Sequence, residues 1–310
     1  MRANVDNLDS PVELRAADVD GIGLLRTEYL FQQMTDFPPE EDQAKAYRKI
    51  VEQADGAPVR IRTFDVNADQ FSFSLENREG NPSLGLRAIR LSLAKEPEFR
   101  AQIRAILTSV NGGIAEIVLP MVTGIDELLV SKRLISEERE RVAERGIMVR
   151  DVRLGAMIEV PSAVLTIADI VKVVDFICLG SNDLVQYLLA VDRDNESVAD
   201  WYQTLHPAVI TAFASVVNAS LLSGTPLTVC GEMAGSAFYT PLLVGLGVKE
   251  LSMNLSAVPA VREVITGIAF DDTVELAKMV SASSSSSNSE SIIRNFFAEH
   301  WDHLDISQLQ

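Results

Sequence analysis

A chain of 310 residues, 47% of them hydrophobic, can bury a sizeable core, and one α/β domain of roughly 200 to 250 residues with extensions is the expected organisation. The net charge of −17 argues against nucleic acid or an anionic membrane surface as the main partner, because both would be repelled over most of the protein surface. The sequence shows neither a signal peptide nor an apolar run long enough to span a membrane, and both cysteines lie in apolar runs typical of reduced thiols, so we expect a soluble cytoplasmic protein.

Short apolar runs alternate with longer amphipathic stretches along the chain, which is the pattern of repeated βα units. Eight runs are predicted as strands, at residues 21–28, 59–66, 84–89, 115–122, 154–160, 175–180, 227–232 and 250–253. Helices are predicted at residues 41–53, 97–110, 124–145, 163–171, 206–222 and 237–247. Eight units predict an α/β fold, a (βα)8 TIM barrel with a C-terminal helical tail, although a doubly wound sheet would give a similar pattern.

The C-terminal region departs from this alternation, so the predicted barrel covers residues 1–280. Residues 281–291 read SASSSSSNSES, which predicts a Ser-rich linker or loop. Residues 292–310 carry apolar side chains at helical spacing, which predicts a helix that docks on the barrel or on a dimer partner. Residues 136–146, SEERERVAERG, are predicted as a solvated outer helix face.

Polar side chains follow most of the predicted strands at the point where each strand ends. In a TIM barrel the carboxyl ends of the strands meet at one mouth, and the active site lies there. The residues expected at this mouth are Arg26, Glu28, Arg62, Asp65, Arg87, Glu159, Asn182, Asp183, Cys230, Glu232, Ser252 and Asn254. Strand ends are often polar simply because they meet solvent, but arginines in three consecutive units of an acidic protein favour a functional mouth.

These residue types predict an anion site beside a metal site. Guanidinium groups bind phosphate and carboxylate oxygens with a planar fork. The arginines that could hold a small anion are Arg26, Arg62, Arg87 and Arg193. Glu159 and Asp183 are hard oxygen ligands of the kind that Mg²⁺ prefers. Cys230 is either an ordinary buried thiol or an acid that faces the ligand, and spacing alone does not separate the two.

Eight motifs occur in a fixed order, and the resemblance that they carry covers about residues 2–270. They are GIGLLRTEYLF, RTFDV, NPSLGLRAIR, LPMV, MIEVPSA, LGSNDLVQYLLAVDR, LHPAV and CGEMAG. In this order they resemble the phosphoenolpyruvate-binding barrel of bacterial Enzyme I, the phosphoenolpyruvate-protein phosphotransferase family of the sugar phosphotransferase system. Pyruvate phosphate dikinase and phosphoenolpyruvate synthase are similar but more distant.

The resemblance implies a role for each candidate site residue. The residues implied to bind substrate are Arg26, Arg62, Arg87, Asn182 and Arg193. Glu159 and Asp183 resemble the family's Mg²⁺ ligands, and Cys230 resembles the catalytic thiol proposed to protonate C3 of the enolate. Two positions depart from the family pattern, because Gln70 replaces a lysine and Ser236 replaces an aspartate. Loss of one cation from a phosphate site is expected to weaken binding, by on the order of 1 to 3 kcal/mol.

The implied activity is transfer of the phosphoryl group of phosphoenolpyruvate to a histidine, which leaves pyruvate. In the family this histidine lies on a separate N-terminal domain, which also docks the small carrier protein HPr. The sequence begins MRANVDN, which resembles the family's connection into the barrel, so we expect the histidine domain to act in cis or in trans, and the chain to be an excised domain or a stand-alone barrel. The family also implies a homodimer.

Two other function classes are weighed against this one. A non-catalytic phosphoenolpyruvate-sensing or dimerisation scaffold is favoured by Gln70 and by the absence of a histidine domain, but the full set of arginines, acids and a thiol argues against it. A lyase or aldolase acting on an oxo-acid ranks last. Four arginines suit a phosphate plus a carboxylate better than a carboxylate alone.

Overall fold

Eight strands form one sheet. They are β1 (Arg2–Val5), β2 (Ile22–Leu25), β3 (Val59–Arg62), β4 (Ile114–Leu119), β5 (Asp151–Ile158), β6 (Phe176–Leu179), β7 (Leu227–Val229) and β8 (Ser252–Met253). Their order is β7-β6-β5-β4-β3-β2-β1-β8, and a parallel bridge between Val229 and Leu251 joins the two ends of that order. Parallel strands in sequential order with the first and last paired define a (βα)8 barrel, so the predicted fold class is confirmed.

The structure, a computed structural model, describes residues 1–6, 14–31, 36–71, 79–110 and 112–304. Their contacts divide the chain into two compact units. The N-terminal unit consists of Asn4–Met157 and Val173–Phe176, and the C-terminal unit consists of Met1–Ala3, Ile158–Lys172 and Ile177–Gln310. The unit boundaries pass through β1, β5 and β6, so each unit holds part of the barrel ladder.

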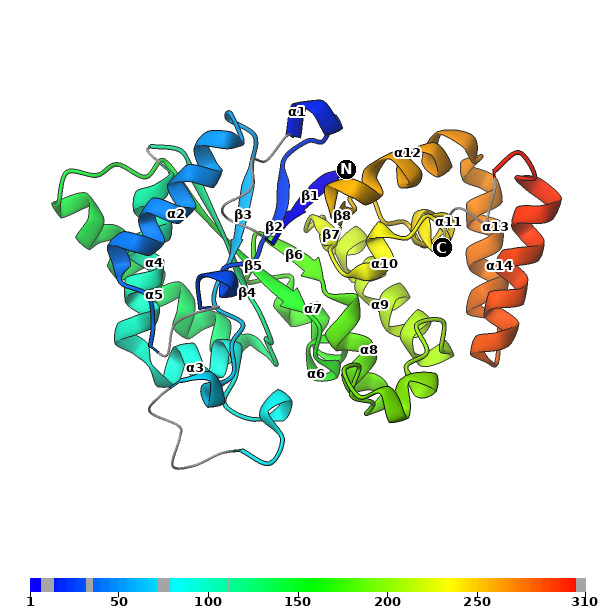
Figure 1. Cartoon of the computed structure of the whole chain (residues 1–310), viewed down its shortest axis with the longest axis horizontal. Helices are drawn as coiled ribbons and strands as arrows, with labels where there is room; N and C mark the ends of the chain where they lie inside the picture. The colour runs from blue at the N-terminus through cyan, green and yellow to red at the C-terminus, as the bar shows by residue number, and fades with distance from the viewer. Residues whose placement is uncertain (7–13, 32–35, 72–78, 111, 305–310) are drawn as a thin grey trace. The chain divides into compact units, whose positions relative to one another are not determined.

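The N-terminal unit places a layer of helices beside its strands. The helices are α1 (Leu14–Ala17), α2 (Glu40–Gln53), α3 (Ala88–Ala94), α4 (Glu96–Ser109) and α5 (Ile125–Glu144), and α2, α4 and α5 pack side by side (Figure 1). Every residue of β2 and β3 is buried, as expected of parallel strands covered on both faces. Glu127 accepts hydrogen bonds from Thr123 and Gly124, which fixes the start of α5.

One predicted strand of this unit is wrong. Residues 84–89 instead end a 3-10 turn, η4 (Pro82–Leu84), and begin α3, with Arg87 at its N-cap. Pro82 lies at the start of η4, where its fixed φ favours a helical turn. The missing strand is β1, which sequence analysis overlooked because four residues reading RANV, alternately half-buried and buried, give no apolar run.

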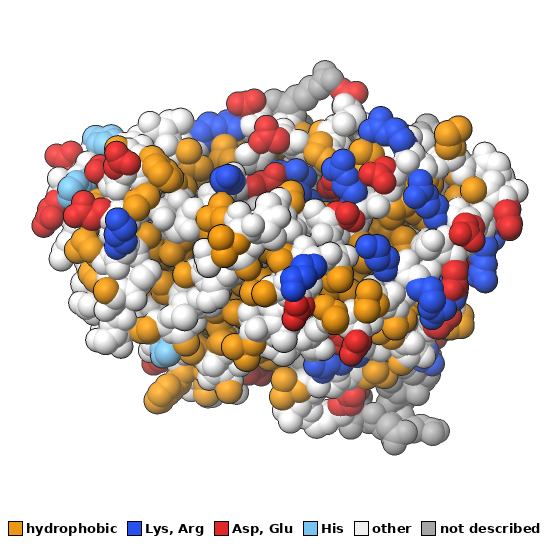
Figure 2. Space-filling view, turned by 180° about the vertical axis from the view of Figure 1, so that it is seen from behind, with side chains coloured by type: hydrophobic (Ala, Val, Ile, Leu, Met, Phe, Trp, Pro, Cys, Tyr) orange, Lys and Arg blue, Asp and Glu red, His pale blue; other side chains and the backbone are white. Residues whose placement is uncertain are grey.

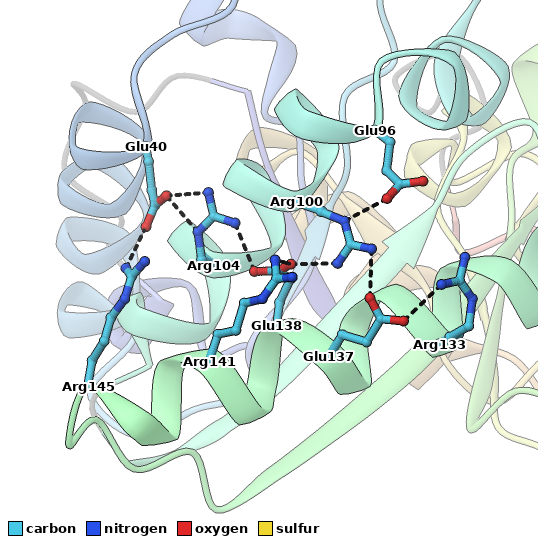
Figure 3. Close-up of polar contacts among 9 residues, drawn as sticks. All are labelled: Glu40, Glu96, Arg100, Arg104, Arg133, Glu137, Glu138, Arg141 and Arg145. Carbon is cyan, nitrogen blue, oxygen red and sulfur yellow. Dashed lines mark hydrogen bonds and ion pairs between the residues drawn. The ribbon is translucent and has the colours of Figure 1, made fainter.

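The predicted solvated face at 136–146 is exposed at most of its residues, but Glu138 is an exception. The Glu138 side chain is 0% exposed, and Arg100, Arg104 and Arg141 donate hydrogen bonds to it at 2.7, 2.8 and 2.6 Å. The wider network adds Glu40, Glu96, Arg133, Glu137 and Arg145 (Figure 3). A charge-rich helix can therefore bury one acid when a neighbouring helix supplies the cations.

The C-terminal unit carries most of the remaining helices. They are α6 (Pro161–Leu165), α7 (Ile167–Ile170), α8 (Ser181–Leu189), α9 (Pro207–Ser223), α10 (Glu232–Gly235), α11 (Thr240–Gly245), α12 (Val258–Gly267), α13 (Phe270–Ser281) and α14 (Ser286–His300). The helix α9 ends at Ser223, and the φ of +74° at the following Gly224 is the left-handed C-cap conformation that glycine adopts without strain. Strands β6 and β7 pair in parallel register from Ile177 and Leu227.

The predicted Ser-rich linker or loop at 281–291 is shorter in the structure, where only residues 282–285 lie between two helices. The helix α13 ends at Ser281, and α14 begins at Ser286 after only four intervening residues. The Ser285 hydroxyl accepts a hydrogen bond from the Asn288 backbone at 3.2 Å, and Ser289 is buried. Serine is a good N-cap residue, so this serine run caps a helix.

The C-terminal helix packs into the core of its own unit. Ile293, Phe296 and Phe297 of α14 are buried in one cluster with Trp301 and residues of α11, α12 and α13. In Figure 1 α13 and α14 run side by side. This contact with the chain itself is one of the two alternatives predicted for residues 292–310, of which 305–310 lie outside the described residues.

Two properties of the chain bear on whether it can contact a membrane or an anionic ligand. Among the described residues, every helix is too short or too polar to cross a bilayer. Figure 2 shows lysine and arginine side chains beside aspartate and glutamate side chains, so charges of both signs are mixed on this face. An anionic ligand must therefore be recognised by local groups, because the whole chain is strongly negative.

Candidate active site

Three candidate arginines lie in the N-terminal unit. Arg26 directly follows β2, Arg62 is the last residue of β3, and Arg87 immediately precedes α3. The Arg26 Nε lies 3.5 Å from Asp6 Oδ1, and its side chain is 29% exposed. The Arg62 and Arg87 side chains are only 8% and 11% exposed. All three guanidinium groups are thus held at the carboxyl ends of strands or at a helix start.

Asp65 joins two of these arginines. Arg87 binds it through two nitrogens, with Nε 2.7 Å from Oδ1 and Nη2 3.0 Å from Oδ2, and Arg62 Nη1 lies 3.2 Å from Oδ2. Arg62 also donates to Glu28 and, at 3.8 Å, to the Met157 sulfur. Burial raises the pKa of the Glu28 carboxyl, and the charge of Arg62 offsets only part of that rise. The sequence predicts Asp65 and Glu28 at strand ends, but it does not reveal that they orient the arginines.

Two buried carboxylates meet in the C-terminal unit. Glu159 directly follows β5 and is 1% exposed, while Asp183 lies in the first turn of α8 and is 6% exposed. One carboxylate oxygen of each lies within 4.8 Å of the other. Two buried carboxylates at this separation repel each other unless a proton or a cation lies between them. Their oxygens suit Mg²⁺, which takes one or two carboxylates and fills its remaining positions with water and substrate oxygens.

Asn182 is held by a ring of hydrogen bonds. Its Nδ2 donates to Glu232 Oε1 at 2.8 Å, and its Oδ1 accepts from the Glu232 backbone N–H at 2.9 Å and from the Ser181 hydroxyl at 3.0 Å. The Tyr202 hydroxyl donates to the Asn182 backbone carbonyl at 2.9 Å. Burial raises the pKa of Tyr202 to about 12, so this hydroxyl remains a donor at neutral pH.

The remaining candidates occupy different environments. Cys230 directly follows β7, is 2% exposed, and its thiol donates to the Leu179 carbonyl at 3.6 Å. Arg193 is more open, with a side chain that is 36% exposed and an Nε 3.8 Å from Asp194 Oδ1. The Arg193 backbone N–H donates to Gln186 of α8 at 3.2 Å. The C-terminal unit thus carries a buried thiol at the end of β7 and a partly exposed cation in the segment that follows α8.

The two departures from the family pattern are only partly described. The backbone of Gln70 belongs to a 3-10 turn, η2 (Ala68–Gln70), but its side chain lies outside the described residues. Ser236 is the C-cap of α10, and its carbonyl accepts a hydrogen bond from Thr240 Oγ1 at 3.0 Å. This contact at the junction between α10 and α11 is made by the backbone, so it does not depend on the serine side chain.

Gly231 lets two loops of the candidate site approach each other. A Cβ atom at this position would lie 1.8 Å from Ser181 Oγ, 2.6 Å from the Ser181 backbone N and 2.8 Å from Asn182 Oδ1. Its φ of −85° suits any residue, so space rather than conformation requires glycine here.

Gly231→Ala is therefore expected to lower the free energy of unfolding by about 1 to 3 kcal/mol, because the Ser181 backbone must move. Gly235→Ala is the matched control in the same motif, since its Cβ would make only ordinary contacts at 3.4 and 3.5 Å. Alanine also favours a helix, so this control is expected to leave stability unchanged or to raise it by up to about 1 kcal/mol. Urea unfolding measures both, and equal losses would contradict the steric argument.

The chain is similar in sequence to several known phosphotransferase proteins. The chain is 34% identical over 300 residues to a phosphoenolpyruvate-protein phosphotransferase of Bacillus sp. (strain S), covering 96% of the chain and 52% of that protein. The corresponding protein of Mycoplasma genitalium is 38% identical over 295 residues, covering 95% of the chain and 50% of that protein. The phosphoenolpyruvate-dependent phosphotransferase system protein of Escherichia coli (strain K12) is 40% identical over 262 residues, covering 84% and 35%.

The chain spans about half the length of the first two relatives and a third of the last. The model of the PEP-utilising enzyme family, PEP-binding domain, matches residues 1–270, where PEP is phosphoenolpyruvate. This range contains all eight motifs on which the predicted resemblance rests. The chain therefore belongs to the family of PEP-utilising enzymes, as a PEP-binding domain.

Proposed function

We propose that this chain binds phosphoenolpyruvate together with Mg²⁺ and delivers its phosphoryl group to a histidine of the phosphotransferase-system type. The observation that carries the proposal is the buried pair Glu159 and Asp183, with Asn182 beside it, in a chain of the PEP-binding family. The histidine would be carried by another domain of a longer protein or by a separate protein, and the reaction would leave pyruvate. Among the curated relatives, phosphoenolpyruvate-protein phosphotransferases support this reaction class.

In this proposal Glu159 and Asp183 hold Mg²⁺, which when bound supplies positive charge to the phosphate and the enolate oxygen. Asn182 donates an N–H to the anion, and the proposed arginine contacts come from Arg26, Arg62, Arg87 and Arg193. The paired acids Asp65 and Glu28 keep the forks of Arg62 and Arg87 oriented. Such charge placement is the main contribution a protein makes to phosphoryl transfer.

The proton balance assigns a role to Cys230. When the bond between phosphorus and the enol oxygen breaks and a bond between phosphorus and the acceptor histidine nitrogen forms, the enolate of pyruvate remains. Its C3 carbon needs one proton to give pyruvate. The Cys230 thiol is the proposed donor and would become a thiolate, which water reprotonates before the next turnover. The buried thiol at the end of β7 supports this assignment.

Asp183→Asn tests the proposed binding site for phosphoenolpyruvate and Mg²⁺. The substitution keeps the size of the side chain but removes one of two carboxylates for the metal, so Mg²⁺-dependent binding of phosphoenolpyruvate should weaken by about 10- to 100-fold. Isothermal titration of phosphoenolpyruvate with and without Mg²⁺ measures it. Asp169→Asn is the control, because Asp169 is an exposed acid of α7 that pairs with Lys172. Lack of saturable binding by the wild type at millimolar ligand would refute the proposal.

A second candidate is a phosphoenolpyruvate-sensing or dimerisation scaffold without transfer activity, which Gln70 in place of the family's lysine favours. A transfer assay separates the two, with labelled phosphoenolpyruvate and the histidine domain of a relative added in trans. Labelled histidine domain supports the phosphotransferase, whereas binding without transfer supports the scaffold. A homodimer is also proposed, and sedimentation equilibrium of the purified chain measures it.

A further inference from the structure

We infer that Glu232 is a positioning residue that fixes the direction of the Asn182 side-chain amide, so that Asn182 presents an N–H rather than an oxygen to an anion. The inference rests on the proposed function for its ligand, but its geometry is independent of that ligand. Glu232 lies in the first turn of α10, directly after β7 and Cys230 and Gly231.

The direction of the amide follows from the chemistry of its partners. The Glu232 carboxylate can only accept a hydrogen bond, so the Asn182 atom that faces it at 2.8 Å must be the NH₂ nitrogen. The Glu232 backbone N–H can only donate, so the atom that faces it at 2.9 Å must be the amide oxygen. Glu232 thus hydrogen-bonds to both the nitrogen and the oxygen of the Asn182 amide. A flipped amide would place its NH₂ group against the Glu232 backbone N–H and its oxygen against the Glu232 carboxylate.

Ser181 supports the same direction. The Met233 backbone N–H points at the Ser181 hydroxyl oxygen at 3.5 Å, which leaves the hydroxyl hydrogen for Asn182 Oδ1 at 3.0 Å. The amide oxygen then accepts two hydrogen bonds, and one of the two N–H groups of the amide donates to Glu232. Its second hydrogen is the one offered to a ligand.

This arrangement explains an acid whose charge would otherwise disfavour an anion site. Glu232 is exposed and bears the same sign of charge as phosphoenolpyruvate, so its Coulomb effect on binding is unfavourable. Its carboxylate oxygen is nevertheless the acceptor that orients Asn182. A glutamine at 232 would keep an acceptor oxygen and the backbone N–H while removing the charge. Glu232→Gln therefore separates two effects of Glu232 on anion binding, the orientation of the Asn182 amide and the repulsion by the carboxylate charge.

A double-mutant cycle tests the inference, with the dissociation constant of phosphoenolpyruvate measured by titration at saturating Mg²⁺. Glu232→Ala is expected to weaken binding about tenfold, because Asn182 loses its orientation. Glu232→Gln should stay within about twofold of the wild type. In the Asn182→Ala background, Glu232→Ala should have no further effect. Additive losses, or wild-type affinity of Glu232→Ala, would overturn the inference.

A second measurement needs no ligand. The NMR signals of the Asn182 side-chain NH₂ group, assigned by comparison with Asn182→Ala, should shift in Glu232→Ala and remain close to wild type in Glu232→Gln. Unchanged signals in Glu232→Ala would contradict the hydrogen bond itself. If the wild type fails to bind phosphoenolpyruvate while the NMR shift occurs, the proposed function fails and the role of Glu232 in orienting Asn182 stands. Melting temperatures of the variants confirm that each is folded.

Discussion

Replacing Glu138 with alanine is expected to lower the free energy of unfolding by on the order of 3 kcal/mol, because three charge-assisted hydrogen bonds at a buried carboxylate are lost, although Arg100 and Arg104 keep other acidic partners. The Glu138 side chain is 0% exposed and accepts hydrogen bonds from Arg100, Arg104 and Arg141. Arg100 and Arg104 are themselves only 14% and 17% exposed, so water cannot fully replace the lost carboxylate. Urea unfolding monitored by circular dichroism measures the loss.

Glu137→Ala is the matched control, because Glu137 is the neighbouring residue of α5 and belongs to the same network (Figure 3). Its side chain is 36% exposed and binds Arg100 and the exposed Arg133, so its loss should cost only a small part of the Glu138 effect. Equal losses at the two positions would show that burial of the Glu138 carboxylate does not matter.

The contribution of Glu138 to the free energy of unfolding should depend on pH. Burial by itself would raise the pKa of the Glu138 carboxyl, but hydrogen bonds from Arg104 and Arg100 outweigh burial and hold the pKa below its ordinary value. A lowered folded-state pKa means that the stabilisation is complete above the unfolded-state pKa of about 4.3 and is lost as pH falls through the folded-state pKa. The difference in unfolding free energy between wild type and Glu138→Gln should therefore shrink as the pH falls below the unfolded-state pKa of about 4.3.

The second large effect is expected at Phe297 in α14. This side chain is 0% exposed, stacks against Phe238 with a centroid distance of 6.2 Å, and meets Trp301 edge-on at 5.1 Å. Phe297→Ala should lower the free energy of unfolding by about 3 to 5 kcal/mol, through lost burial and the cavity that remains. A helix that merely rested on the surface would not show so large a loss.

Phe270→Ala is the control for Phe297→Ala. Phe270 is the first residue of α13 and is 62% exposed, so the same chemical change should leave stability within about 0.5 kcal/mol of the wild type. Urea midpoints for the two variants give the comparison. If both variants unfolded at the wild-type midpoint, α14 would have to be peripheral to the folded C-terminal unit.

Local sequence patterns were sufficient for most of the fold. Seven of the eight predicted strands coincide with strands of the structure, because a strand buried on both faces reads as a continuous apolar run. Strand β1 was missed, since four residues that are only alternately buried carry no such run. The serine content of residues 281–291 predicts a loop, because serine-rich segments are usually flexible. In the structure Ser285 instead caps α14, and the apolar residues that hold this helix in place lie further along the chain.

The residues that follow the strands can be read from the sequence, because they come directly after local apolar runs, and the ordered motifs indicate the family. The partners of those residues depend on the tertiary structure. Glu138 is buried because arginines of α4 face it, and Asn182 is oriented because Gly231 lets Glu232 approach across 50 residues of chain. Hydrogen-bond direction and burial are set by neighbours distant in sequence, and no local pattern records them.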